Sequence, residues 1–201
     1  MKKQGLFHSI KLVCSLILSS SLLTGCLANI WTGANLVYDR HNIYKKISDF
    51  QLSANASQAL YQDDRLRCED CSIDLAIFNG DILLAGHVPT NELRQEAKER
   101  VAALTGYRRL FNQIDISSLP KNNVEDSWIT AKIRASIVAN SEIDPHVFKV
   151  ITSDRIVYLM GDVRPKQAAK VIDIARNSAK VLRVVKLLKY YHLSNQASVD
   201  N

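Results

Sequence analysis

Two cysteines, Cys68 and Cys71, are separated by two residues in the stretch CEDC, and this spacing supports three kinds of chemistry. A C-x-x-C pair can be a redox couple, half of a zinc site or a local disulfide. A zinc site needs two more ligands, and the histidines are scattered without metal-ligand spacing. A redox couple would begin a helix after a strand, whereas this pair precedes a strand pattern. In an oxidising compartment a structural disulfide is favoured, with a redox pair and free thiols as the alternatives.

The N-terminal segment predicts that the chain is exported to such a compartment. Lysines at positions 2, 3 and 11 accompany an apolar segment over residues 12–23. A segment of about a dozen apolar residues is shorter than the ~20 needed to span a bilayer, and it is typical of a secretory signal. We therefore predict that residues 1–25 are a signal peptide that is removed.

The stretch LTGC, which ends at Cys26, resembles the lipobox of bacterial lipoproteins. The resemblance implies that the Cys26 thiol receives diacylglycerol, that Cys26 becomes the first residue, and that its amine is acylated. An ordinary signal peptide with an incidental cysteine is the alternative. Leu27, in place of an aspartate, favours the outer membrane in the enterobacterial sorting pattern. No later run approaches eighteen consecutive apolar residues, so we expect a lipid anchor at the periplasmic face of the outer membrane.

Trp128 marks the candidate binding surface, in the stretch DSWITAKIRASIVAN over residues 126–140. Isoleucines recur every four residues from position 129 and form the stripe that a helix would bury. Trp128 lies about 140° from the centre of that stripe at 100° per residue. Its neighbours form a second apolar face flanked by two cations: Ala131, Ala135, Val138, Lys132 and Arg134. These residues predict a contact with anionic phospholipids, namely phosphatidylglycerol or cardiolipin. The alternative is that the ring packs against another part of the protein.

Charge separates the two halves of the chain. The formal net charge is +6, and it becomes +3 when the three lysines of the signal segment are removed. Asp39–Ser118 contains 10 basic and 12 acidic residues, whereas Asp126–Tyr191 contains 12 basic and 6 acidic residues. The second half is therefore the electrostatic partner for anions.

An internal repeat predicts an α+β fold of two tandem modules. GDILLAGHVP from Gly80 aligns with DRIVYLMGDVRP from Asp154, and each copy reads as helix, strand, strand, helix, strand. We expect two helices on one face of a small three-stranded sheet in each module. The first helix of the second copy is predicted to be capped by Asp126 or Ser127. The predicted boundaries are a lipidated linker at 26–45, a first domain at 46–118, a linker at 119–125, a second domain at 126–191 and a tail at 192–201.

The repeat carries a family resemblance. Each copy contains an LxG strand end, a charged helix and an RVV-type last strand, and the two copies follow a lipobox. This arrangement resembles the BON-domain proteins of the bacterial envelope over Val37–Tyr190. The resemblance implies that the second domain binds anionic phospholipid through its first helix while the first domain supports it. It also implies a role in outer-membrane integrity, with no enzymatic activity and no cofactor. One position departs from the family: the first copy keeps Gly106 before its last strand, whereas the second has Lys180, which would be strained in a left-handed turn.

Other functions fit the sequence less well. The module order and positive charge are shared with some RNA-binding domains, but there is no GxxG loop and no strand lined with aromatic residues, so we expect no nucleic-acid binding. We find no nucleophile and base at catalytic spacing and no phosphate-binding glycine loop. The alternative function is an interaction scaffold for outer-membrane assembly, division-site or peptidoglycan-side proteins. In either case we expect the protein to be a monomer.

Overall fold

The structure, a computed structural model, describes residues 36–62, 64–118, 120 and 122–191. The signal segment, Cys26 and the tail at 192–201 lie outside the described residues. The chain divides into two units, Met1–Ile43 and Tyr44–Asn201, and both sheets belong to the second unit.

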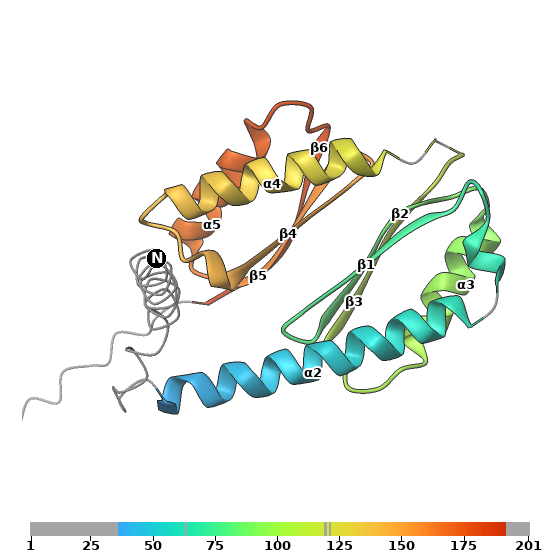
Figure 1. The fold of residues 1–201 in the computed structure, drawn as a ribbon, viewed down its shortest axis with the longest axis horizontal. Helices are drawn as coiled ribbons and strands as arrows, with labels where there is room; N and C mark the ends of the chain where they lie inside the picture. Colours follow the sequence, from blue (N-terminus) through green and yellow to red (C-terminus); the bar gives the residue numbers. More distant parts are fainter. Residues whose placement is uncertain (1–35, 63, 119, 121, 192–201) are drawn as a thin grey trace, which may run out of the picture. The chain divides into compact units, whose positions relative to one another are not determined.

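The first module consists of a long helix, a two-stranded hairpin, a second helix and a third strand (Figure 1). Strand β2 is central, antiparallel to β1 and parallel to β3. The elements are α2 (Leu36–Tyr61), η1 (Asp64–Arg67), β1 (Ser72–Phe78), β2 (Asp81–Val88), α3 (Asn91–Ala102) and β3 (Arg109–Ile116).

The second module repeats this topology, with β5 central, antiparallel to β4 and parallel to β6. The two modules confirm the predicted α+β fold. The elements are α4 (Asn123–Ala139), η2 (Pro145–Val147), β4 (Phe148–Ser153), β5 (Ile156–Val163), α5 (Pro165–Arg176) and β6 (Arg183–Tyr190).

Each module has its own core between its helices and one face of its sheet. In the second module the isoleucine stripe of α4 is buried, as the four-residue spacing predicts, and packs with apolar residues of β4, β5 and α5. In the first module the matching positions of α2 are Leu52, Ala56 and Leu60, which are also buried. The pattern is therefore shared because it builds the common fold.

The opposite faces of the two sheets form a third apolar cluster. Ala76, Leu83 and Ala85 of the first sheet lie in one cluster with Tyr158 and Met160 of the second. The helices consequently cover the outer face of each sheet, as Figure 1 shows. Strands β2 and β5 are buried on both faces, which explains their nearly continuous apolar sequences.

The predicted cap of α4 is wrong. The helix begins at Asn123 and its cap is Asn122, four residues before Asp126. The side chain of Asn122 accepts a hydrogen bond from the backbone N–H of Glu125 at 3.3 Å. Asp126 is buried, and its carboxylate accepts the backbone N–H groups of Asp154 and Arg155 at 2.9 and 2.8 Å. Asp126 therefore caps the turn of the β4–β5 hairpin, whose two turn residues both have positive φ.

The first module uses the same device, because Asp49 accepts the N–H groups of Asn79 and Gly80 at 2.7 and 2.8 Å. Helix α2 starts at Leu36, ten residues before position 46, so half of the predicted linker is helical.

Lys180 adopts the left-handed conformation that the family's glycine would occupy. Its φ is 70°, close to the 85° of Gly106 in the first module. Its Nζ donates a hydrogen bond to Oε1 of Glu125 on α4 at 2.8 Å. An ion pair therefore accompanies the backbone strain at this position.

Candidate functional site

Helix α4 presents an apolar stripe on the face opposite its buried isoleucines. Trp128 is 49% exposed, Val124 is 83% exposed and Val138 is 68% exposed. Ala131 and Ala135 lie between Trp128 and Val138 and are also exposed. We call these five residues the α4 stripe. Their spacing of four, three, four and three residues keeps them on one side of the helix. The sequence analysis did not include Val124 in this surface, because the predicted helix began at Asp126.

Lys132, one turn further along the helix, lies over the ring of Trp128. The Lys132 Nζ lies 5.1 Å from the centre of the indole ring, which is a cation–π contact. Trp128 belongs to none of the three buried clusters formed by the described residues. The ring is therefore a half-exposed apolar surface with a cation above it.

The two cations beside the stripe have no acidic partner among the residues that the structure describes. Neither Lys132 nor Arg134 forms a salt bridge there, and both are exposed. At 100° per residue, Lys132 lies about 40° to one side of Trp128 and Arg134 about 120° to the other. The stripe thus has a positive charge on each flank.

Glu125, in the first turn of α4, is paired with basic residues of the same module. Lys180 pairs with one carboxylate oxygen, and the Nε of Arg155 lies 3.7 Å from the other. The hydrogen bond from Lys180 lowers the pKa of Glu125, so this carboxyl group is ionised at neutral pH. Its charge therefore does not oppose those of Lys132 and Arg134.

The first module lacks this combination of residues. Gln51, Asn55 and Ser57 occupy the positions of α2 that match Trp128, Lys132 and Arg134, and all three are exposed. Helix α2 instead exposes Phe50 and Ile47, at 76% and 50%. The fold does not require Trp128, Lys132 or Arg134, since the first module forms without them.

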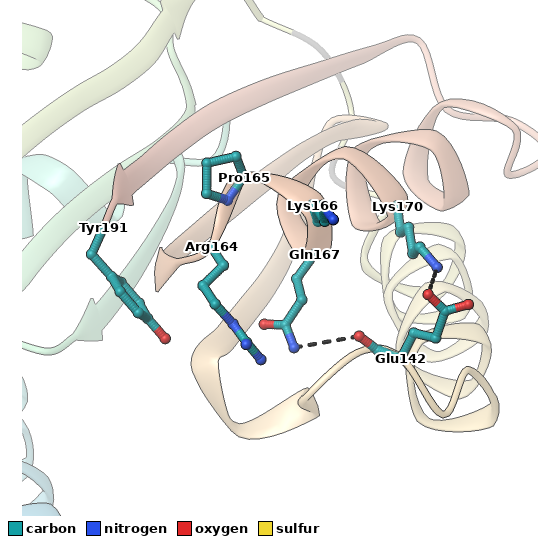
Figure 2. A pocket seen from close by; sticks show the side chains of 7 residues that line it. All are labelled: Glu142, Arg164, Pro165, Lys166, Gln167, Lys170 and Tyr191. Atoms are coloured by element: carbon teal, nitrogen blue, oxygen red, sulfur yellow. Dashed lines mark hydrogen bonds and ion pairs between the residues drawn. The ribbon is translucent and has the colours of Figure 1, made fainter. Parts of the chain in front are cut away.

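The second module also has an open pocket at the start of α5, shown in Figure 2. The cavity is about 480 Å³, and its lining includes Arg164, Lys166, Lys170 and Tyr191. Lys170 forms an ion pair with Glu142, whose backbone oxygen accepts a hydrogen bond from Gln167 at 3.3 Å. The lining contains no histidine, cysteine, serine or threonine. The pocket adds positive charge to the second module.

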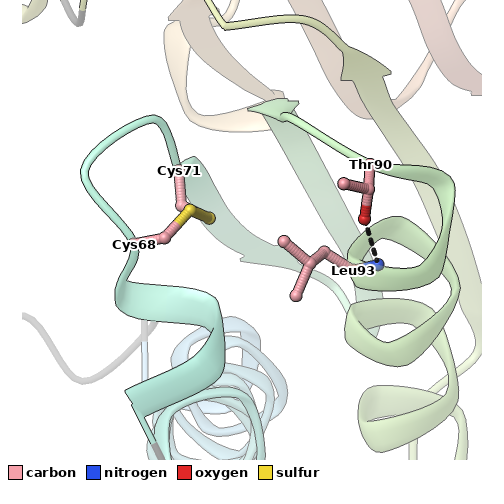
Figure 3. The surroundings of a disulfide bond; sticks show 4 residues. All are labelled: Cys68, Cys71, Thr90 and Leu93. Atoms are coloured by element: carbon pink, nitrogen blue, oxygen red, sulfur yellow. Dashed lines mark hydrogen bonds between the residues drawn. A yellow bond between two sulfur atoms is a disulfide. The ribbon is translucent and has the colours of Figure 1, made fainter.

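Cys68 and Cys71 are joined by a disulfide in the link between η1 and β1 (Figure 3). The backbone N–H of Cys71 donates to the carbonyl of Cys68 at 3.0 Å, so the pair closes a tight turn. Cys71 packs against the core of the first module. The pair precedes a strand and does not begin a helix.

The helices of the two modules pack against the sheets through their buried apolar residues. Among the described residues, no helix combines the length and the apolar character needed to cross a bilayer.

Two copies of one α–β–β–α–β module define a tandem-domain α+β protein whose second copy carries an exposed apolar and basic helix. Residues 48–118 and 125–190 both match the BON domain. The chain belongs to the BON-domain family.

The chain is similar in sequence to named bacterial proteins. The chain is 32% identical over 147 residues to the "21 kDa hemolysin" of Actinobacillus pleuropneumoniae, covering 72% of this chain and 75% of that protein. It is 26% identical over 189 residues to the "Outer membrane lipoprotein DolP" of Haemophilus influenzae, covering 90% and 96% of the two chains. Comparison with the solved C-terminal domain of CdsD from Chlamydia trachomatis gives a TM-score of 0.30 at 12% identity, covering 70% of this chain and 98% of that one.

Proposed function

We propose that this protein is a lipid-anchored component of the outer membrane that binds anionic phospholipids through α4 and supports membrane integrity. It acts by binding and not by catalysis. The observation that carries the proposal is the α4 stripe, where a half-exposed Trp128 lies under Lys132 on a helix of the more basic module. An interfacial tryptophan and flanking cations suit a helix that lies on an anionic leaflet.

The anchor is proposed at Cys26. The LTGC sequence supports it, and so does the likeness to a relative named as an outer membrane lipoprotein. Mass spectrometry of the N-terminal peptide should find Cys26 as the first residue, carrying diacylglycerol and an N-acyl group. An unmodified cysteine, or cleavage elsewhere, would refute the anchor.

The lipid-binding proposal is tested by vesicle flotation of residues 27–201, which include every described residue. We expect flotation with vesicles containing phosphatidylglycerol or cardiolipin, and little with neutral phosphatidylcholine. Trp128→Ala should weaken flotation, whereas Phe50→Ala should not, although Phe50 is the more exposed ring. Equal losses in the two variants would count against α4.

Fluorescence reports directly on the proposed contact. The chain has two tryptophans, so Trp31→Phe leaves Trp128 as the reporter. Its emission should shift to the blue when anionic vesicles are added, because the ring enters a less polar environment. An unchanged emission while the protein floats would place the contact elsewhere.

The second candidate function is an interaction scaffold, which exposed Ile47 and Phe50 on α2 favour. Such a scaffold would bind an envelope protein, of the assembly machinery or the division site, with fixed stoichiometry and without regard to lipid charge. Loss of that binding in Phe50→Ala, with no flotation of the unaltered protein, would favour this function over lipid binding.

We propose that the disulfide between Cys68 and Cys71 is a structural clip. Its place in a link before β1, without a helix that begins at the pair, supports this role. The protein should show no insulin reductase activity, and Cys68→Ser should leave flotation unchanged. Reductase activity that Cys68→Ser abolishes would favour a redox role.

A further inference from the structure

The loop between α5 and β6, residues 177–182, lies beside α4 and presents an exposed apolar side chain. Leu182 is 66% exposed, while the preceding Val181 packs against the core of the second module. The backbone N–H of Leu182 donates to the carbonyl of Arg155 at 2.9 Å. The loop is therefore fixed to the β4–β5 turn with Leu182 directed away from the core.

Lys180 connects the same loop to α4. Its Nζ reaches Glu125 at 2.8 Å, and its carbonyl accepts a hydrogen bond from the Nε of Arg155 at 2.9 Å. At 100° per residue, Glu125 lies about 60° from Trp128 on the helix, on the same side as Lys132. The loop thus lies along the Lys132 edge of the α4 stripe, next to its first turns.

The first module has a matching loop with different chemistry. There the backbone N–H of Arg108 donates to the carbonyl of Gly80 at 2.6 Å, as Leu182 does to Arg155. Arg108 uses its side chain to pair with Asp81 and Asp162. The second module therefore has the exposed Leu182 where the first has the paired Arg108. It has Lys180, which pairs with α4, where the first has Gly106.

We propose that the 177–182 loop is a second membrane-contacting element of this protein, in which Leu182 enters the anionic bilayer beside Trp128. Lys180 is a positioning residue that holds the loop against α4 and neutralises Glu125 at the lipid-facing edge. The occupant is a phospholipid bilayer because the loop continues the α4 stripe and lies on its basic flank. This inference rests on the proposed lipid binding by α4.

A site-specific label tests the loop separately from the helix. Residues 27–201 contain only Cys68 and Cys71, which are joined, so Leu182→Cys introduces a single free thiol for an environment-sensitive dye. In a Trp31→Phe background, Trp128 and the dye are read in the same sample. On vesicles containing phosphatidylglycerol, both emissions should shift to the blue. A dye at Asn55→Cys, the exposed position of α2 that matches Lys132, should not shift.

The possible outcomes separate the two proposals. A shift of Trp128 without a shift of the dye at position 182 overturns the loop proposal and leaves lipid binding by α4 standing. If neither shifts and the protein does not float, lipid binding fails, and the loop proposal fails with it. A shift at Asn55→Cys as large as that at Leu182→Cys would show contact without a preferred face, which also overturns the proposal.

Substitutions test the contribution of each residue. Leu182→Ser should weaken vesicle partitioning about fivefold, since it removes one exposed apolar side chain from the contact. Lys180→Gly introduces a residue that tolerates positive φ but cannot pair with Glu125. It should reduce the emission shift of the dye at position 182 while the circular dichroism spectrum stays unchanged. Lys180→Arg should restore the shift. A full shift in Lys180→Gly would show that Lys180 does not position the loop.

Discussion

At the scale of single residues, Trp128 and the cations beside it should contribute to binding through different forces. The ring contributes apolar transfer energy, whereas Lys132 and Arg134 each contribute about 1 kcal/mol near a charged surface. The Debye length falls from about 10 Å at 0.1 M salt to about 3 Å at 1 M. Salt should therefore weaken the contribution of the cations and leave that of the ring.

Trp128→Ala should lower vesicle partitioning about tenfold at every salt concentration, as loss of a buried aromatic surface implies. Lys132→Glu with Arg134→Glu should abolish the preference for phosphatidylglycerol over neutral lipid at low salt, and its effect should fade at high salt. Sedimentation with vesicles across a salt series measures both. Parallel salt curves for the two variants would contradict the separation.

Gly86 lies where the backbone of the neighbouring strand β1 leaves no room for a side chain. Its φ is 103°, and a Cβ there would lie 2.0 Å from the carbonyl oxygen of Ser72. We predict that Gly86→Ala destabilises the protein by about 3 kcal/mol or more, because the strand pair must separate to admit the methyl group. Thermal unfolding followed by circular dichroism measures the loss.

Gly106 provides the matched control for Gly86→Ala. Its φ is 85°, yet no atom lies within 4 Å of an added Cβ. Gly106→Ala should therefore cost only the left-handed backbone strain of about 1–2 kcal/mol. Equal losses in the two variants would show that steric contact with Ser72 is unimportant.

At the scale of elements, each module ties its first helix to its first hairpin through one carboxylate. Asp49 and Asp126 accept the two backbone N–H groups of their respective turns. Removing Asp126 leaves two such groups without their acceptor at a partly buried turn, and each unsatisfied group costs about 1–3 kcal/mol. Asp126→Ala should lower the free energy of unfolding by about 2–4 kcal/mol.

Chemical denaturation of Asp126→Ala measures this cost. Ser127→Ala is the control, since Ser127 is exposed and neighbours Asp126 in the same helical turn. It should change stability by less than about 0.5 kcal/mol. A loss in Ser127→Ala as large as in Asp126→Ala would indicate a helix-capping effect in place of the hairpin contact.

The sequence predicted the elements better than the contacts between them. Isoleucine spacing located the buried face of α4, and the same spacing left Trp128 on the outer face, because periodicity depends on local geometry alone. Asp126 resembled a helix cap in sequence, but its partners lie 28 and 29 residues away in a turn. Tertiary partners of this kind leave no local pattern. The places of Lys180 and Leu182 beside α4 were missed for the same reason.

At the scale of the whole second unit, the sequence also does not predict that one sheet packs on the other. Apolar residues on both faces of β2 and β5 are compatible with a buried strand of any sheet. The structure shows that one face of each strand packs against its own helices and the other belongs to the shared cluster with Tyr158 and Met160. The two modules therefore contact each other through this apolar cluster.

An arginine at the edge of this contact connects the two modules by charge. Arg108 donates to Asp81 of its own module at 2.7 and 2.6 Å and to Asp162 of the second module at 3.0 and 2.9 Å. Asp81 is 1% exposed and also pairs with Arg109. Burial alone would raise the pKa of Asp81, but the hydrogen bonds from Arg108 and Arg109 outweigh it and hold the pKa below its usual value.

The lowered pKa of Asp81 makes stability depend on acidity in a defined direction. A carboxyl group whose folded pKa lies below its unfolded pKa of about 3.9 stabilises the fold above that pH. This contribution should be lost as the pH falls from about 4 through the folded pKa, because protonation weakens the bonds to both arginines. Asp81→Asn should lower stability at pH 7 by about 3 kcal/mol and flatten the acid dependence.

Denaturation of the protein and of Asp81→Asn between pH 7 and pH 2 measures how steeply the free energy of unfolding falls with pH in each. Asp64→Asn serves as the control, because Asp64 is exposed and lies 3.6 Å from its basic partner Arg67. It should keep the stability at pH 7 within about 0.5 kcal/mol and retain the acid slope. An acid slope in Asp81→Asn equal to that of the unaltered protein would show that the ionised pairing of Asp81 with Arg108 and Arg109 contributes nothing to stability.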